Sequence, residues 1–450
     1  MSLKKWIPLA ASLVASSTLG VDTFRIQDLG TLSATPSDGV RAASINNRGH
    51  VHGENDKSVP GGGMLQWRSF RWDGEDLHEI FPLKSGSTWV GGLNDRDQCV
   101  GKFSAGGGTR MHGYVWDEGP LVEYDIGDRN FSHLMDVNAG GICAGTYLSN
   151  EVWQFVYRYH AFAMNPGGQW VDLGTLGGYE SYGRAINDRN HVVGHTRDAA
   201  NHYLGYLWTY GGGMIDLGHL GGIYCDPEDL DNLDRIVGAS ADESGDRRPF
   251  LWEDGEMREL GTLGGLTGRA KSINDHGVIV GTSHDASDAK RGTLWEAGGI
   301  HDLNHLVVDG DAWEITGAAE INELGEIAGT GLLKGVQRAY KLTPILEASR
   351  VAGFQPGFAG MENRFFGLGF TPHAQVDLYY GLNAGATELS CGESLDISAA
   401  RRFAAIQADA GGRIELTADL PAQAKGRTVL FQAVERVTCR VGELRTQGIH

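Results

Sequence analysis

The sequence predicts an all-β protein: a seven-bladed β-propeller closed by its own N-terminal strand and followed by a small β-sandwich. Three observations predict this fold. One pattern recurs seven times, a β-rich segment follows each copy, and one segment that the last copy lacks occurs near the start of the chain instead. Repeats of about 40 to 50 residues with four short strands each are typical of propeller blades.

The recurring pattern is clearest in AINDRNHVVG at 185–194, where an apolar residue precedes an Asn-Asp turn and a short run of β-formers ends in glycine. Asn and Asp bond their own turns and glycine supplies positive φ, so the pattern predicts a tight hairpin. We expect the apolar residue before each anchor, and a recurring Trp, to belong to the core. The anchors are Asn46, Asn94, Asn138, Asn187, Asp231, Asn274 and Asn322, with spacings of 48, 44, 49, 44, 43 and 48 residues.

The order of the remaining segments indicates how the ring closes. Each hairpin is followed by a β-rich segment such as LGYLWTY and, in six copies, by a third segment such as MIDLGHLGG. After RAYKLTP the third segment is missing, but FRIQDLGTL occurs at 24–32. A ring whose N-terminal strand completes its last blade removes two sheet edges at once.

The termini and composition indicate a secreted protein. Residues 1–21 have the lysines, apolar run and small residues of a signal peptide, 22–345 form the predicted propeller, and 346–450 form the predicted sandwich. No segment is apolar for long enough to cross a bilayer, so no transmembrane segment is expected. The net charge of −19 argues against a nucleic-acid partner.

The five cysteines divide between the two predicted domains. Cys391 and Cys439 form an isolated pair in the tail, and in an exported protein such a pair predicts a disulfide. Cys99 and Cys143 occupy equivalent positions in neighbouring repeats and are predicted to be buried, although a bridge between them stays open. Cys225 has no predicted partner.

The repeats resemble the HAF family of bacterial extracellular repeats. The resemblance is carried by DLGTLGGYESYGRAINDRNHVVG, LGYLWTYGGGMIDLGHLGG and RELGTLGGLTGRAKSINDHGVIVG, and it is closest between 170 and 303. It implies a propeller-type fold and export. It implies no reaction, because the residues shared with the family are the structural ones.

If the repeated positions are structural, function is expected where the repeats differ. The second-to-third-strand loops and the loops between blades share one face of a propeller, and there they carry acids, histidines and aromatic residues. Aromatic rings with polar neighbours suit a sugar polymer, so an extracellular polysaccharide, or else a cell-surface protein, is the predicted partner. The predicted ligand-binding residues are Trp89, Tyr182, His195, Asp198, Tyr224, Asp242, His284, Asp285 and Trp313.

Two further readings stay open. Asp136, Asp229 and Glu320 lie two residues before their anchors and are the metal candidates; no cofactor is expected, with calcium kept open.

The alternative function is a polysaccharide lyase or glycoside hydrolase at the mouth of the ring, using His or Tyr as base with an Arg, or two carboxylates. No nucleophile motif such as GxSxG is present, and no catalytic residue is assigned.

Overall fold

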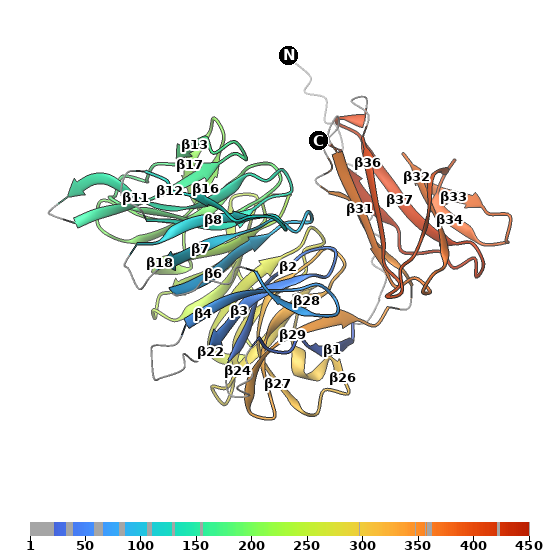
Figure 1. Cartoon of the computed structure of the whole chain (residues 1–450), viewed down its shortest axis with the longest axis horizontal. Helices are drawn as coiled ribbons and strands as arrows, with labels where there is room; N and C mark the ends of the chain where they lie inside the picture. Colours follow the sequence, from blue (N-terminus) through green and yellow to red (C-terminus); the bar gives the residue numbers. More distant parts are fainter. Residues whose placement is uncertain are drawn as a thin grey trace, which may run out of the picture.

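The computed structural model describes residues 22–32, 39–57, 66–80, 86–105, 110–127, 131–153, 156–296, 298–346, 348–355, 357, 362–420 and 424–449. The predicted signal peptide lies outside them. The described chain is all-β and propeller-like, with one 3-10 turn, Leu303–His305 (Figure 1). None of the described helical segments has the length and apolar character needed to span a membrane.

Each of the first three repeats forms a four-stranded antiparallel sheet. Their strands are β2 (Val40–Ile45), β3 (Val51–Lys57), β4 (Gln66–Trp72) and β5 (Leu77–Glu79); β6 (Gly86–Leu93), β7 (Cys99–Ala105), β8 (His112–Trp116) and β9 (Val122–Tyr124); and β10 (Ser132–Val137), β11 (Cys143–Trp153), β12 (Val156–Met164) and β13 (Trp170–Asp172).

The fourth and fifth repeats are joined into one eight-stranded sheet through a parallel pairing of Tyr203 with Tyr224, and the sixth repeat is separate. Their strands are β14 (Ser181–Ile186), β15 (Val192–Arg197), β16 (Tyr203–Thr209) and β17 (Gly213–Asp216); β18 (Gly221–Leu230), β19 (Ile236–Asp242), β20 (Arg247–Glu253) and β21 (Glu256–Glu259); and β22 (Gly264–Ile273), β23 (Ile279–Asp285), β24 (Lys290–Glu296) and β25 (Gly299–Asp302).

The last repeat takes its outer strand from the N-terminal end of the described chain. Strand β1 (Phe24–Asp28) pairs antiparallel with β29 (Val336–Pro344), so that Phe24 lies opposite Pro344. The same sheet contains β26 (Val307–Val308), β27 (Trp313–Ile321) and β28 (Ile327–Leu333). The predicted pairing of the N-terminal strand with the last repeat is confirmed.

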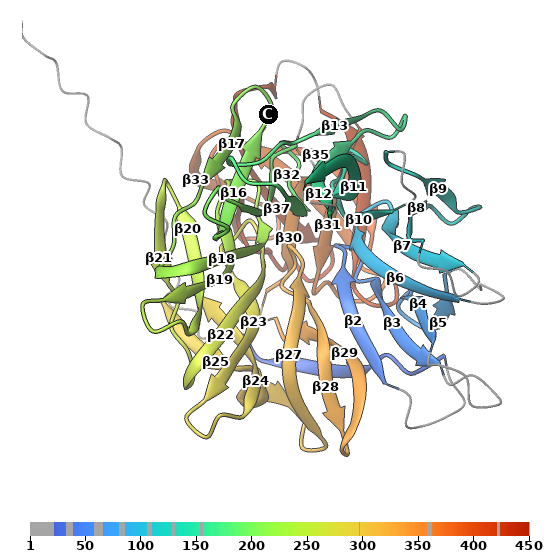
Figure 2. The same cartoon turned by 90° about the vertical axis from the view of Figure 1, so that its left-hand side faces the viewer.

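The first strand of each repeat contacts the first strand of the next, and β27 contacts β2, which joins the last repeat to the first (Figure 2). The apolar residue before each anchor is buried, as predicted, and so are four of the five recurring Trp side chains; Trp116 is half-buried. These side chains fill the space between neighbouring sheets.

The anchors build one turn seven times. The third residue after each anchor has a left-handed backbone, with φ between 60° and 81°, and is Gly, Asn or Asp in every repeat. In the fourth repeat, for example, Asn187 Oδ1 accepts hydrogen bonds from the backbone N–H groups of Arg189 (3.1 Å) and His191 (3.0 Å). The residue types therefore recur because the turn requires them.

The same anchors also bond one repeat to the next. The Nδ2 atoms of Asn46, Asn94, Asn138, Asn187, Asn274 and Asn322 each donate to the backbone carbonyl of the following anchor, at 2.8–3.1 Å. The last of these bonds runs from Asn322 to Asn46. The side chain of Asp231 has no N–H to donate, and the side chain of Arg235 makes the bond to the next anchor instead. Arg235 Nε lies 2.5 Å from Asp231 Oδ2, and Arg235 Nη2 donates to Asn274 O at 3.4 Å.

The C-terminal region forms two sheets that pack over one core, with Phe354, Phe365 and Phe431 at its centre. One sheet contains β30 (Arg350–Gln355), β31 (Glu362–Leu368) and β36 (Ile414–Asp419); the other contains β35 (Arg401–Gln407), β32 (Gln375–Gly381), β37 (Thr428–Glu435) and β38 (Arg445–Gly448); β33 (Ala384–Glu388) and β34 (Ser394–Ile397) form a hairpin.

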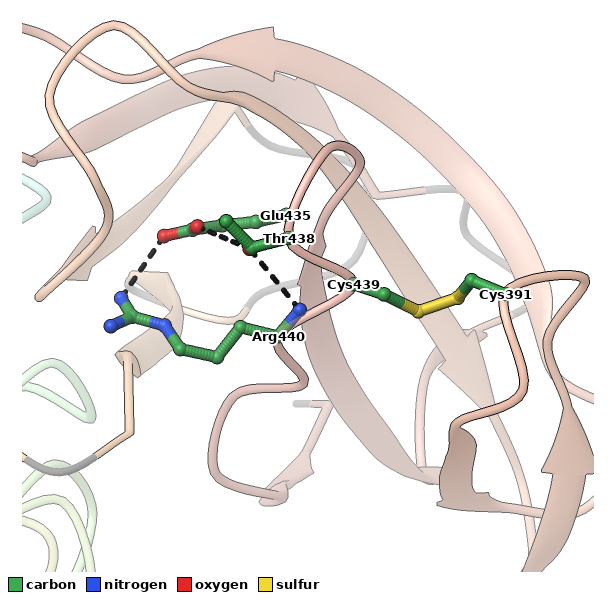
Figure 3. The surroundings of a disulfide bond; sticks show 5 residues. All are labelled: Cys391, Glu435, Thr438, Cys439 and Arg440. Atoms are coloured by element: carbon green, nitrogen blue, oxygen red, sulfur yellow. Dashed lines mark hydrogen bonds and ion pairs between the residues drawn. A yellow bond between two sulfur atoms is a disulfide. The ribbon is translucent and has the colours of Figure 1, made fainter.

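The predicted disulfide is present. Cys391 and Cys439 are bonded, with their Cα atoms 6.2 Å apart. Beside it, Thr438 Oγ1 donates to Glu435 Oε2 at 2.7 Å, and Arg440 Nη2 lies 3.0 Å from Glu435 Oε1 (Figure 3). These bonds fix the turn that presents Cys439.

The other three cysteines, Cys99, Cys143 and Cys225, are free and buried. Burial raises the pKa of each thiol to about 12. They therefore behave as small apolar core residues, which confirms the prediction for the first two.

The C-terminal region lies behind the repeats in the view of Figure 2, and its side chains contact the anchor turns. Arg413 Nη1 lies 2.9 Å from Glu326 Oε1, and Lys341 Nζ lies 3.1 Å from the same oxygen; the Glu326 side chain is fully buried. Arg48 Nη2 contacts Glu415 Oε1 at 2.7 Å. This side of the ring is therefore covered, and the opposite side carries the loops in which ligand binding was predicted.

Candidate functional site

A cavity of about 540 Å³ lies among the first strands of the ring, on the side away from the C-terminal region. Four basic residues from separate segments line it: Arg41, Arg184, Lys271 and Lys290. Because successive side chains of a strand point to opposite faces, alternate positions of the first strands face the channel. We call this cavity the mouth.

A second cavity, of about 170 Å³, lies under the C-terminal region and is lined by the anchor turns and by Gln355. Asp95, Asp188 and Asp275, each directly after an anchor, line it and accept backbone N–H bonds from the preceding repeat at 2.8–3.0 Å. Burial raises the pKa of Asp95 and Asp188 to about 6 and that of Asp275 to about 8. We call this cavity the acidic end.

The metal candidates Asp136, Asp229 and Glu320 line both cavities and therefore lie between them. Asp136 Oδ2 accepts from Ile186 N at 2.9 Å, and the other two make the equivalent bond to the next repeat at 3.0 Å. Burial raises the pKa of Asp136 to about 6 and of Asp229 to about 7, and it raises that of Glu320 well above its usual range. Each carboxyl thus fastens neighbouring repeats together.

Among the described residues, one group of three possible ligands has its ligand atoms within 4.8 Å of one another: His112, Glu123 and Asp125. The histidine Nδ1 lies 2.6 Å from one carboxylate and 2.8 Å from the other, so contacts of the ring with both carboxylates account for the group. Asp136, Asp229 and Glu320 are not in such a group, and their role as metal ligands stays a prediction.

Three of the predicted ligand-binding residues, Tyr182, His195 and Tyr224, come together beside the mouth. The rings of Tyr182 and His195 are stacked, with centroids 4.7 Å apart and planes 24° apart. Tyr159 also stacks with Tyr182, at a centroid distance of 5.6 Å, and Tyr203 lies edge-on to His195 at 5.7 Å. We call Tyr159, Tyr182, His195, Tyr203 and Tyr224 the aromatic wall; the fourth and fifth repeats supply all of it except Tyr159.

The polar centre of this group is Asp226, which is 4% exposed. His195 Nδ1 lies 3.0 Å from Asp226 Oδ1, and Oδ2 accepts from the Tyr224 hydroxyl at 3.0 Å and from Arg269 Nη1 at 2.7 Å. Burial opposes ionisation of Asp226, but the hydrogen bond from His195 and the charges of Arg184 and Arg269 outweigh it and lower its pKa. Asp226 is therefore a carboxylate that holds His195 in one orientation.

This group is continuous with the mouth. Arg184 lines the mouth and its Nη2 lies 3.7 Å from Asp226 Oδ2. Glu228, which also lines it, is paired with Arg269 and with Lys271, whose Nζ lies 3.0 Å from Glu228 Oε2. A ligand in the mouth would therefore meet charged groups connected to the aromatic wall.

Asp198, Asp242 and Asp285 build turns on the loop side instead of a joint site. Asp242 Oδ1 accepts from the backbone N–H groups of Ser244 and Asp246, and Asp285 Oδ1 accepts from those of Ser287 and Ala289. Asp198 makes the same pair of bonds within its own turn. The loops differ in sequence but repeat the anchor-turn geometry.

The remaining three predicted residues are separate from the aromatic wall. His284 Nδ1 lies 2.7 Å from Thr267 Oγ1. Trp89 has Lys102 Nζ 5.4 Å from its ring centroid, and Trp313 packs edge-on against Tyr340 at 6.0 Å. Trp313 lines a different cavity, formed with His301 and its neighbours.

Sequence reasoning missed the basic residues of the mouth and the central role of Asp226. A signal for them exists in the first strands. Counting back from each anchor, the third position lines the mouth in all seven repeats and holds Ala43, Gly91, Met135, Arg184, Glu228, Lys271 and Ala319. The fifth position holds Arg41, Trp89, His133, Tyr182, Asp226, Arg269 and Gly317. The period of two in these strands could have identified them.

No family model and no curated protein matches the chain. Among solved structures it is similar to TolB from Acinetobacter baumannii (11% identity, TM-score 0.36, covering 69% of this chain and 65% of that one). It is also similar to AofleA from Arthrobotrys oligospora (12%, TM-score 0.36, 62% and 89%) and to a gluconolactonase from Xanthomonas campestris (13%, TM-score 0.35, 72% and 96%). The chain thus spans less than two thirds of TolB, and at these TM-scores the similarities carry no argument about function.

Proposed function

We propose that this is a secreted binding protein of the HAF-repeat type, a closed seven-bladed propeller followed by a β-sandwich, that holds an extracellular polysaccharide at the mouth. Support for the ring comes from the chain of anchor bonds that returns from Asn322 to Asn46 and from the β1–β29 pairing. Support for export comes from the sequence of residues 1–21 and from the disulfide.

The observation that carries the binding proposal is the stacked Tyr182–His195 pair next to a 540 Å³ cavity. Aromatic faces pack against the C–H faces of sugar rings, and the surrounding charged and hydroxyl groups bond to sugar hydroxyls. The covered anchor-turn side leaves the loop side for a long polymer.

The test is retention of the mature protein on a panel of insoluble polysaccharides, with and without calcium. Tyr182→Ala should weaken retention about tenfold or more, which corresponds to about 1.4 kcal/mol. Tyr210→Ala is the matched control, because Tyr210 is 87% exposed and lies in a turn outside the mouth. Equal retention of the two variants, or no retention of the unchanged protein, would contradict the proposal.

The His195–Asp226 pair favours one second candidate, a polysaccharide lyase. With Nδ1 bonded to Asp226, Nε2 of His195 is the atom that could accept a proton from a sugar carbon, while Arg184 or Arg269 neutralises an adjacent carboxylate. A two-carboxylate hydrolase would need an acid other than Asp226, because hydrogen bonding and nearby positive charge lower the pKa of that carboxyl. Release of unsaturated fragments, lost in His195→Ala, would show the lyase; retention without release supports binding alone.

A further inference from the structure

Four basic and four acidic side chains line the mouth, but they are not all paired with one another. Among the described residues, no carboxylate forms an ion pair with Arg41 or Lys290, and Lys271 shares Glu228 with Arg269. Arg41 instead packs on the ring of Trp67, with its Cζ 4.5 Å from the centroid. These cationic groups stand in a chain whose net charge is −19.

Three of these groups are close enough to repel one another. Burial lowers the pKa of Lys290, and the charges of Lys271 and Arg41 lower it further. The three residues come from β2, β22 and β24, so the fold brings together like charges from the first and sixth repeats. Gathering like charges, two of them without an ion-pair partner among the described residues, costs free energy, and a bound anion would offset that cost.

Among the described residues, the deeper acids form no ion pair with this group. Asp136, Asp229 and Glu320 are directed to backbone N–H groups of the next repeat, and burial favours their protonated forms. The wall between Arg41 and Lys290 is instead neutral and polar, formed by Thr282, Thr316, Thr330 and Gln337. Hydroxyl and amide groups of this kind suit the uncharged hydroxyls of a sugar.

We propose that the mouth selects a carboxylated sugar chain, with a uronate carboxylate held by Arg41, Lys271 and Lys290 and a neighbouring sugar ring against the Tyr182–His195 wall. This rests on the proposed polysaccharide binding and adds the charge of the ligand. Arg41 supplies a planar guanidinium that can bond a carboxylate through two N–H groups, and the lysines act as point charges.

The test compares three soluble probes by titration calorimetry with the mature protein: an oligogalacturonate, its methyl ester and dextran sulfate. The oligogalacturonate should bind at least tenfold more tightly than its ester, and this preference should fall as salt is raised. Dextran sulfate tests whether the mouth prefers sulfate groups to carboxylate groups on a sugar chain. If it binds more tightly than the oligogalacturonate, the carboxylate assignment is wrong. Equal binding of acid and ester would overturn the inference while leaving the proposed function intact, whereas no binding of any saccharide, here or on the polysaccharide panel, would overturn both.

The variants Lys290→Met and Arg41→Gln should each lower the affinity for the oligogalacturonate about tenfold and leave that for the ester unchanged. Arg258→Gln is the matched control, since Arg258 is exposed on outer strand β21 and carries the same charge. Because Lys290 is surrounded by like charge, Lys290→Met should also keep or raise the melting temperature without ligand. A fall in melting temperature, or equal loss of affinity in Arg258→Gln, would contradict the assignment.

Discussion

The mouth and the acidic end are built from the same first strands, yet the mouth carries four basic side chains, whereas the acidic end is lined by carboxyl groups and is covered by the C-terminal region. At the acidic end, carboxylates such as Asp95 and Asp188 bond to backbone N–H groups of the neighbouring repeat. At the mouth, Arg41 and Lys290 lack ion-pair partners among the described residues. Charged side chains at the acidic end hold neighbouring repeats together, whereas on our proposal those at the mouth meet a ligand.

The largest expected effect tests whether both ends depend on one closed ring. Deleting residues 22–32 removes β1 and its ladder with β29, and also the buried Leu29. The last sheet would then expose an unpaired edge, so we expect loss of the cooperative melting transition or a fall of many degrees. Circular dichroism during heating provides the measurement; a melting temperature equal to that of the intact chain would show that closure does not depend on this strand.

The next prediction compares the anchor turns with the similar turns on the loop side, such as that of Asp198. Asn187→Ala removes two acceptor bonds in its own turn and two donor bonds to the fifth repeat, at a site that is 5% exposed. Leaving such buried groups unpaired should lower the free energy of unfolding by about 3 kcal/mol. Asp198→Ala disrupts the same kind of turn at the surface and should lower the free energy of unfolding much less. Denaturant unfolding measures both, and equal losses would contradict the distinction.

The fifth repeat suggests a rescue of that anchor. Asn187→Asp removes the donor and should destabilise the ring, but adding His191→Arg copies the Asp231–Arg235 arrangement at the equivalent positions. The double variant should recover at least half of the lost stability in the same unfolding experiment. A double variant no more stable than Asn187→Asp would mean that the arginine does not replace the amide donor.

The smallest effect concerns pH. The pKa values of about 6 to 8 for Asp95, Asp136, Asp188, Asp229 and Asp275 exceed those of about 4 in an unfolded chain. The folded state therefore binds more protons, and stability present below about pH 4 is lost as the pH rises through these values. Asp229→Asn should flatten the decline of melting temperature between about pH 4 and 8. Asp198, whose pKa is lowered by hydrogen bonds to the His202 turn, is the control, because Asp198→Asn should leave that decline unchanged.

The sequence predicted the repeats, the anchors, the buried Trp positions, the N-terminal closing strand and the disulfide, because each depends on local turn chemistry or on counting. It predicted the candidate site only in part. Tyr182, His195 and Tyr224 lie together as a surface next to the mouth, but Asp198, Asp242 and Asp285 were chosen because their loops differ, and the structure shows the same turn three times. Loop sequence alone does not separate a ligand-facing acid from one that bonds its own turn.

What the sequence determined by itself is therefore the periodic part of this protein, since a tight turn needs Asn, Asp or Gly wherever it occurs. What only the tertiary structure decided is which non-repeated residues from different repeats come together. Asp226 meets His195 from the preceding repeat and Arg269 from the following one, and Arg41 faces Lys290 although 249 residues separate them in the chain. The contacts of Asp226 depend on the packing of successive repeats, and the proximity of Arg41 and Lys290 depends on the contact of the last repeat with the first, which brings strands far apart in sequence to one cavity.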